Sequence, residues 1–141
     1  MINEHKDVVK MAGEHNVKFI RLQFPDVFGN LKNIAITVSD LNLALQGGIG
    51  ANSFAINSYL RAREQDIILK PDPDTFALFP WRPREGAVGR LICDVYQPDG
   101  QPFPGCSRNI LKEAAQEASR LGLQITTACE IEFYLIQPDD G

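Results

Sequence analysis

The chain has 141 residues, of which 44% are hydrophobic and 23% charged, a composition typical of a folded globular domain. Its net charge of −4 and its lack of a basic run argue against a surface that binds nucleic acid or an anionic membrane. No apolar run approaches the roughly 18 residues that a membrane helix needs, and the N-terminus lacks the apolar core of a secretion signal. We therefore expect a cytoplasmic protein with no membrane contact. Three widely spaced cysteines predict neither a CxxC metal site nor a disulfide framework.

Strand-like runs dominate residues 15–100. The runs rich in β-branched and aromatic residues are 17–24, 31–38, 66–70, 75–79 and 88–96. The first two are joined by the turn at Pro25–Asn30 and predict a hairpin. The third and fourth flank a turn at Pro71–Asp74, and we expect a strand on each side of it.

Short helices are expected between these strands. One covers residues 3–15, where apolar residues form a rough stripe. A second begins after Ser39 or Asp40, either of which can cap it, and ends at Gly47–Gly48. Residues 49–65 are small, polar and irregular, and they predict a long loop.

Prolines and glycines between residues 98 and 105 mark a change of pattern. Ser107 can cap a helix from about Arg108 to Leu121, in which apolar residues recur at helical spacing. A strand-like run from Leu123 to Ile136 follows. Because one helix and one strand cannot bury their own apolar faces, we expect them to begin a second, larger domain.

Two carboxylates, Glu130 and Glu132, stand two residues apart in that last run, so a strand would project both from one face. Such a pair is costly to bury unless a cation neutralises it, and Mg²⁺ or Mn²⁺ is one such cation. The alternative is an edge strand with one wet face, in which Ile131 and Phe133 point inward. The pattern alone leaves both readings open and favours the wet edge.

A series of short motifs runs through the chain in a recognisable order. The motifs are Val17–Phe24, Asp26–Gly29, Lys32–Asn33, Ser39–Leu41, Asp66–Asp72, Thr75–Phe76, Phe79–Trp81, Ile92–Tyr96, Pro98–Gly100, Pro102–Gly105, Arg108–Lys112 and Glu130–Phe133. In order and spacing this series resembles the opening of a bacterial type I glutamine synthetase. The resemblance covers residues 17–136 and ends at a match to the family's E-x-E-F.

The resemblance implies an α+β fold, with a β-grasp-like N-terminal domain followed by the first helix–strand unit of a catalytic domain. Residues 1–102 would form the β-grasp domain, preceded by the short helix at 3–15, and residues 103–141 the truncated start of the catalytic domain. It also implies a homo-oligomer, usually a dodecamer. Each active site would lie between the catalytic domain of one subunit and the β-grasp domain of its neighbour.

The implied reaction joins ammonium to the side-chain carboxylate of L-glutamate. ATP is the co-substrate, γ-glutamyl phosphate is the intermediate, and Mg²⁺ or Mn²⁺ supplies charge neutralisation. By the family pattern, Glu130 would ligate the metal nearer the nucleotide phosphates and Glu132 the metal nearer glutamate. The nucleotide pocket and the remaining ligands would lie downstream, so we expect residues 1–141 alone to be inactive.

One motif departs from the family pattern. The family carries a D-G-S-S loop whose Asp helps to bind and deprotonate ammonium, and the equivalent stretch here is Asn52–Ala55. Asn52 can accept a hydrogen bond but is not a practical base. Two alternatives to a glutamine synthetase therefore stay open: a γ-glutamyl–amine ligase with a different amine substrate, and a non-catalytic β-grasp module for assembly or regulation.

Overall fold

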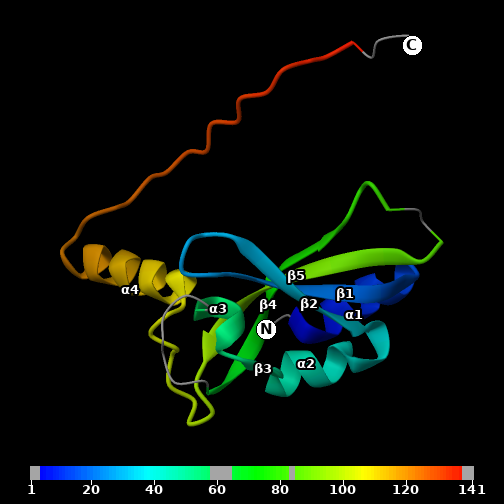
Figure 1. Cartoon of the computed structure of the whole chain (residues 1–141), viewed down its shortest axis with the longest axis horizontal. Coiled ribbons are helices and arrows are strands. Elements are labelled where there is room, and N and C mark those ends of the chain that lie inside the picture. The colour runs from blue at the N-terminus through cyan, green and yellow to red at the C-terminus, as the bar shows by residue number, and fades with distance from the viewer. Residues whose placement is uncertain (1–3, 58–64, 83–84, 138–141) are drawn as a thin grey trace.

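The computed structural model describes residues 4–57, 65–82 and 85–137, and these form a mixed α+β fold, as predicted (Figure 1). In chain order the elements are α1 (Glu4–Glu14), β1 (Val17–Pro25), β2 (Leu31–Thr37), the 3₁₀ turn Val38–Asp40, α2 (Leu41–Gly47), β3 (Ile49–Asn52), α3 (Phe54–Asn57), β4 (Asp66–Leu78), β5 (Ala87–Tyr96) and α4 (Ser107–Arg120). None of the described helices is long and apolar enough to cross a membrane.

The strands form one sheet in the order β2-β1-β5-β4-β3. The central pair, β1 and β5, is parallel, whereas each of the other neighbours is antiparallel. The predicted hairpin is confirmed, because β1 and β2 pair from Phe19 opposite Thr37 to Pro25 opposite Leu31. The parallel pair brings the two ends of the domain together, since Val17 lies opposite Ala87.

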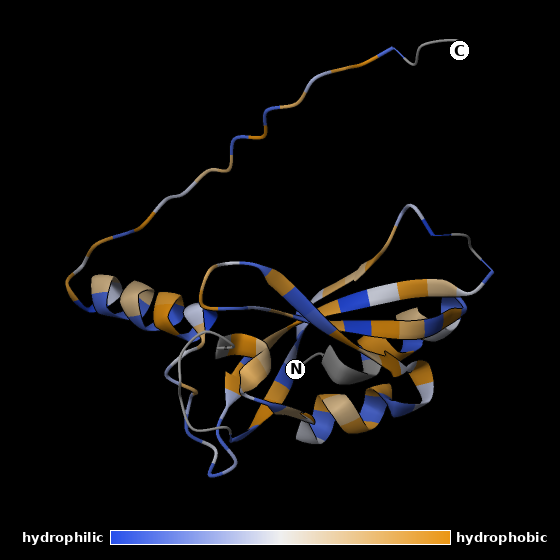
Figure 2. Ribbon diagram, viewed as in Figure 1, coloured by the Kyte–Doolittle hydropathy of each residue, from blue (hydrophilic) through white to orange (hydrophobic). Residues whose placement is uncertain are grey.

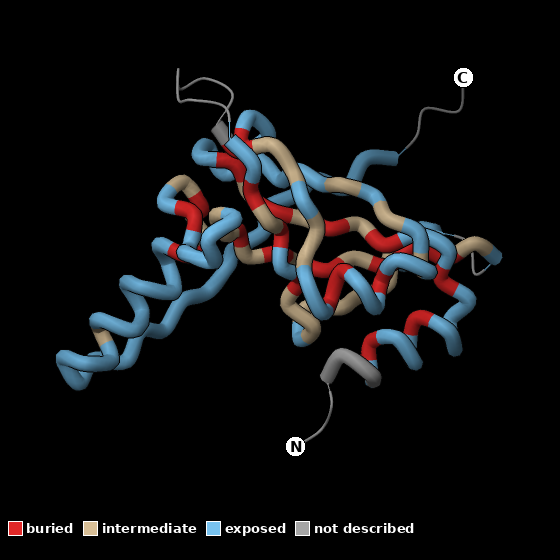
Figure 3. The backbone as a smooth tube through the Cα atoms, turned by 90° about the horizontal axis from the view of Figure 1, so that it is seen from below, coloured by how far each residue is buried: buried red, intermediate tan, exposed pale blue. Residues whose placement is uncertain are grey.

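One face of the sheet carries the hydrophobic core. Alternate residues of the strands are buried there, including Leu22 of β1, Leu69 of β4 and Leu91 of β5, each with 0% of its surface exposed. Helices α1 and α2 cover this face with Val8 and Leu41. Figure 3 shows the result as short buried segments that alternate with exposed ones along the chain.

The long loop predicted for residues 49–65 is wrong in its first half. Residues 49–52 form β3, which pairs antiparallel with β4 so that Ile49 lies opposite Leu69, and residues 54–57 form α3. A four-residue strand that contains Gly50 has too few apolar positions to show alternation. Residues 58–64 lie outside the described residues.

The two strands predicted on either side of Pro71–Asp74 are a single strand, β4, with an irregularity inside it. Asp72 pairs with Ile92 and Ala77 with Arg90, so the residues between them bulge out of the ladder. The hydroxyl of Thr75 donates to the carbonyl oxygen of Asp72 at 2.7 Å and accepts from the backbone N–H of Ile92 at 2.8 Å. This side chain takes the place of a backbone acceptor, which allows the strand to continue past the prolines.

The predicted helix after the boundary is confirmed as α4, although its N-cap is Cys106 and no side chain caps it. Polar contacts anchor its first turns to the sheet. The Arg108 Nε donates to Asp94 at 2.7 Å, and the buried Asn109 side chain donates to the carbonyl oxygen of Val95 at 2.7 Å. Its apolar stripe lacks a cover, since 67% of the surface of Leu111 is exposed (Figure 2).

The strand predicted for residues 123–136 is not formed. The described residues that follow α4 are extended and exposed, and they lead away from the sheet (Figure 1). Ile131 and Tyr134, which alternation would place on different faces, are 83% and 93% exposed. A strand exists only where a neighbouring strand accepts its hydrogen bonds, and none of the described elements offers one here. The domain boundary expected between residues 102 and 103 stays a prediction.

Gly48, which ends α2, gives a test of this packing. Its φ is +79°, and a Cβ there would lie 2.6 Å from Ile68 Cγ2 and 2.8 Å from the carbonyl oxygen of Leu69. We expect Gly48→Ala to lower the free energy of unfolding by about 1–3 kcal/mol, measured by urea denaturation. Gly13→Ala is the matched control, because nothing lies within 4 Å of its Cβ position, and it should stabilise by about 0.4–1 kcal/mol. Equal midpoints for the two variants would contradict the packing described.

Candidate functional site

The segment after edge strand β3 carries the first predicted site residue. Asn52 ends β3, and its side-chain oxygen accepts a hydrogen bond from the backbone N–H of Phe54 at 2.8 Å. This is the turn that an Asn or Asp side chain forms with the backbone two residues on, and it starts α3. Asn52 is therefore held at the edge of the sheet with a partly exposed side chain.

Ser53 anchors the segment after β3 to the residue that precedes β4. Its side chain is buried, its N–H donates to the carbonyl oxygen of Gln65 at 2.9 Å, and its hydroxyl accepts from the Gln65 N–H at 3.1 Å. The two ends of the connection between β3 and β4 are thereby pinned together. No local pattern reveals this role of Ser53, because its partner lies twelve residues away in the sequence.

A second turn supports α3 from the β1–β2 hairpin. The backbone N–H of Val27 donates to the carbonyl oxygen of Ile56 at 3.2 Å, which joins the two loops. Asp26 shapes this turn, because its carboxylate accepts from the N–H groups of Phe28 at 2.9 Å and Asn30 at 2.8 Å. Sequence reasoning placed Asp26 in a motif without seeing this role, and the available signal was an Asp at the start of a turn that ends in Gly–Asn.

These contacts change the acidity of Asp26. The side-chain amide of Asn30 is the largest of the causes that hold the pKa of this carboxyl below its ordinary value of 3.8. Burial acts in the opposite direction, while backbone N–H groups of Asn30 and Phe28 and the charge of Lys32 lower the pKa further. The turn is therefore built around an ionised carboxylate.

The structure does not bring the predicted metal ligands to this loop. Glu130 and Glu132 are exposed on the extended segment after α4, away from the sheet that carries Asn52 (Figure 1). The described part of the chain holds no group of three or more His, Cys, Asp or Glu side chains that could bind a metal. Two carboxylates suit a hard cation such as Mg²⁺ in chemistry, but they leave most of its coordination shell to other ligands.

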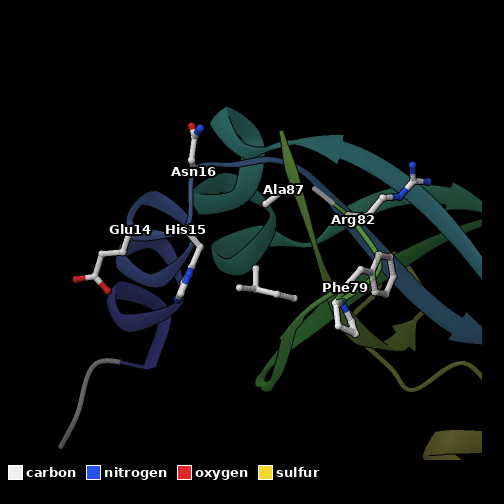
Figure 4. A pocket seen from close by; sticks show the side chains of 8 residues that line it. Glu14, His15, Asn16, Phe79, Arg82 and Ala87 are labelled. Carbon is white, nitrogen blue, oxygen red and sulfur yellow. The ribbon is translucent and has the colours of Figure 1, made fainter. Parts of the chain in front are cut away.

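A cavity of about 590 Å³ lies elsewhere, between the end of α1 and the start of β5. It is lined by Glu14, His15, Asn16, Leu78, Phe79, Pro80, Arg82 and Ala87. Figure 4 shows the side chains of Glu14, Asn16 and Arg82 pointing in different directions, so its polar groups do not converge on one point. It contains none of the predicted site residues.

The buried Cys93 does not offer a nucleophile. Burial raises the pKa of the Cys93 thiol to about 12, and the neighbouring charge of Asp94 acts in the same direction. The group therefore stays protonated at neutral pH and packs as a small apolar side chain.

A parallel central strand pair with antiparallel neighbours, and helices over one face, defines a small α+β domain of the β-grasp type. Residues 16–98 match the family model of the glutamine synthetase β-grasp domain, and the chain belongs to the glutamine synthetase family. Both the family and the β-grasp fold predicted from the sequence are thereby confirmed.

Among curated relatives, the glutamine synthetase of Clostridium saccharobutylicum is 46% identical over 136 residues, and that of Methanosarcina mazei is 42% identical over 134 residues. These matches cover 96% and 95% of this chain but only 31% and 30% of the relatives, so the chain spans less than a third of their length. Among solved structures, GmaS in complex with ADP superposes with a TM-score of 0.71 at 27% identity. That match covers 82% of this chain and 26% of GmaS.

The pKa of Asp26 leads to a test of the turn. Because this pKa is lower in the folded state, the carboxylate stabilises the fold fully above a pH of about 4 and progressively less as the pH falls through the lowered pKa. We expect Asp26→Ala to lower the urea midpoint at about pH 7, and the difference from the wild type to shrink below about pH 4. Asp26→Asn, which keeps an acceptor oxygen but cannot titrate, is the control. A difference that does not change with pH would contradict this account.

Proposed function

We propose that the chain is the N-terminal part of a glutamine synthetase that joins ammonium to L-glutamate with cleavage of ATP. The observation that carries the proposal is the family match over residues 16–98, supported by glutamine synthetases at 46% and 42% identity that cover nearly the whole chain. Residues 1–102 would be the β-grasp domain and residues 103–141 the first part of the catalytic domain. The protein would work in the cytoplasm as a homo-oligomer, a dodecamer in which neighbouring subunits share active sites.

Within that enzyme, Glu130 and Glu132 would hold a divalent metal, Mg²⁺ or Mn²⁺. Such a metal, when bound, neutralises the phosphate charge that opposes attack by the glutamate carboxylate. The solved relative with bound ADP supports a nucleotide as the other substrate. For these carboxylates to act, the segment around them must join a sheet, which residues 123–137 do not do within this chain.

The loop at the sheet edge would serve the ammonium side of the reaction. Asn52 stands where the family has an Asp, and its side-chain oxygen is engaged with the N–H of Phe54. The exposed Ala55 stands where the family has a serine. An uncharged loop at this place favours a second candidate, a γ-glutamyl–amine ligase whose substrate is an amine other than ammonium.

The metal role is tested in the longer protein that carries this chain. We expect it to form glutamine from glutamate, ATP and ammonium, and Glu130→Gln or Glu132→Gln to lower kcat/KM by at least about 100-fold because each removes a metal ligand. Glu113→Gln, an exposed carboxylate on α4, is the control and should leave activity unchanged. Residues 1–141 should form none, and detectable glutamine from them would contradict the assignment of the site.

The amine is tested at Asn52. An Asp can accept the same hydrogen bond from Phe54, so Asn52→Asp should fold normally while it restores a base. We expect this variant of the longer protein to raise kcat/KM for ammonium about tenfold or more, measured as phosphate release. Ala55→Ser, which adds a hydroxyl without charge, is the control. If the wild type uses ammonium as well as Asn52→Asp does, the loop does not limit ammonium use, and a panel of amines will show which substrate is preferred.

A further inference from the structure

The face of the sheet opposite α1 and α2 is polar, and we call it the open face. Strand alternation places on it the residues between the buried ones. They are Phe19, Arg21 and Gln23 of β1, Ile68, Lys70 and Asp72 of β4, and Arg90, Ile92, Asp94 and Tyr96 of β5, and each is half-buried or exposed. Lys70 and Tyr96 pack against each other on this face, with the Lys70 ammonium 4.2 Å from the centre of the Tyr96 ring.

Two arginines lie side by side at the middle of the open face. Arg21 and Arg90 are opposite each other in the parallel β1–β5 pair, and neighbouring strands lie about 4.8 Å apart. Arg21 donates to the neutral side-chain oxygen of Asn33 at 3.1 Å. The Nη1 of Arg90 is buried and has no hydrogen-bond acceptor among the described residues. Like charges on adjacent strands repel, and an unmet buried donor is costly, so this pair lacks an anion.

The carboxylates of the open face do not meet this need. Asp72 and Asp94 both bind Arg108 at the start of α4, and Asp94 also binds Lys112. Asp94 stands four residues along β5 from Arg90, which is about 13 Å in a strand. These two carboxylates are therefore committed to holding α4.

We propose that Arg21 and Arg90 bind an Asp or Glu carboxylate from the part of the longer protein that follows residue 141. This inference rests on the proposed function, in that it takes the chain to be the first part of a longer enzyme. Two arguments identify this ligand: the positive charge of the arginines, and the covalent link through α4 to the rest of the longer protein. A planar guanidinium matches a carboxylate in shape and has the opposite charge. Two neighbouring guanidinium groups can donate hydrogen bonds to the same carboxylate.

The connection comes from α4. Arg108, in the first turn of α4, ties the start of this helix to Asp72 and Asp94 on the open face, and the chain continues from the other end of the helix, after Arg120. The matched relatives extend well beyond this region, since the chain covers 31% of the Clostridium saccharobutylicum protein. Ile110 and Leu111 on the same helix are 55% and 67% exposed, so they offer apolar surface against which a following domain can pack. A tethered domain that packs here reaches the arginines at a high effective concentration.

The test compares Arg90→Met in residues 1–141 and in the longer protein by thermal unfolding. Met keeps an unbranched apolar stem but removes the unmet donor and the repulsion with Arg21. We expect the unfolding midpoint of residues 1–141 to rise by roughly 2–4 °C, and that of the longer protein to fall by roughly the same amount because a carboxylate loses its partner. Arg82→Met, an exposed arginine outside the open face, is the control and should shift neither midpoint.

A change of the same sign in both proteins would overturn the proposal. Arg21→Met provides a second variant, and it should show the same reversal of sign. If inorganic phosphate raises the midpoint of wild-type residues 1–141 and Arg90→Met does not reverse its sign, the site takes a free oxyanion and the proposal is wrong. Glutamine formation is measured in parallel. A longer protein that makes glutamine without the reversal refutes this inference alone, and one that shows the reversal without glutamine refutes the proposed function alone.

Discussion

The parallel pairing of β1 with β5 is the contact on which the rest of this domain depends. It joins Val17 to Ala87 and Gln23 to Ile92, which lie at opposite ends of the β-grasp region. The outer strands then add on either side, β2 to β1 and β4 with β3 to β5. The loops of the candidate site follow from that order, because the Asp26 turn ends β1 and Asn52 ends β3. The order of the strands thus brings these two loops together, and the Val27–Ile56 hydrogen bond joins them.

The same pairing fixes both faces of the sheet at once. Leu22 and Leu91 are opposite each other and both fully buried, so the residues before them, Arg21 and Arg90, must lie together on the other face. A shift of register that separated the arginines would also take the leucines out of the core. The two arginines are therefore held together by the apolar packing behind them, and their repulsion is a cost that this packing imposes.

Sequence reasoning succeeded where a pattern was local and long enough. The β1–β2 hairpin, α1 and α4 each have a periodic run with a turn or glycine at the end, and all three are confirmed. It failed at β3, which is too short to alternate, and at β4, where Thr75 keeps a strand continuous past two prolines. It also predicted a strand around Glu130 that requires a partner strand, and no local pattern reveals whether a partner is present. The roles of Asp26 and Ser53 depend on contacts between loops, which a sequence shows only after folding.

The long separation between β1 and β5 has a consequence for synthesis on the ribosome. The first hairpin can form as soon as β2 has emerged, but its apolar face has no central neighbour until β5 follows it out of the exit tunnel. During that interval Ile20, Leu22 and Phe24, which end at 1% exposure or less, lack the core side chains that β5 brings beside them. A nascent chain paused before residue 87 thus carries an incomplete core and is more exposed to aggregation than the finished domain.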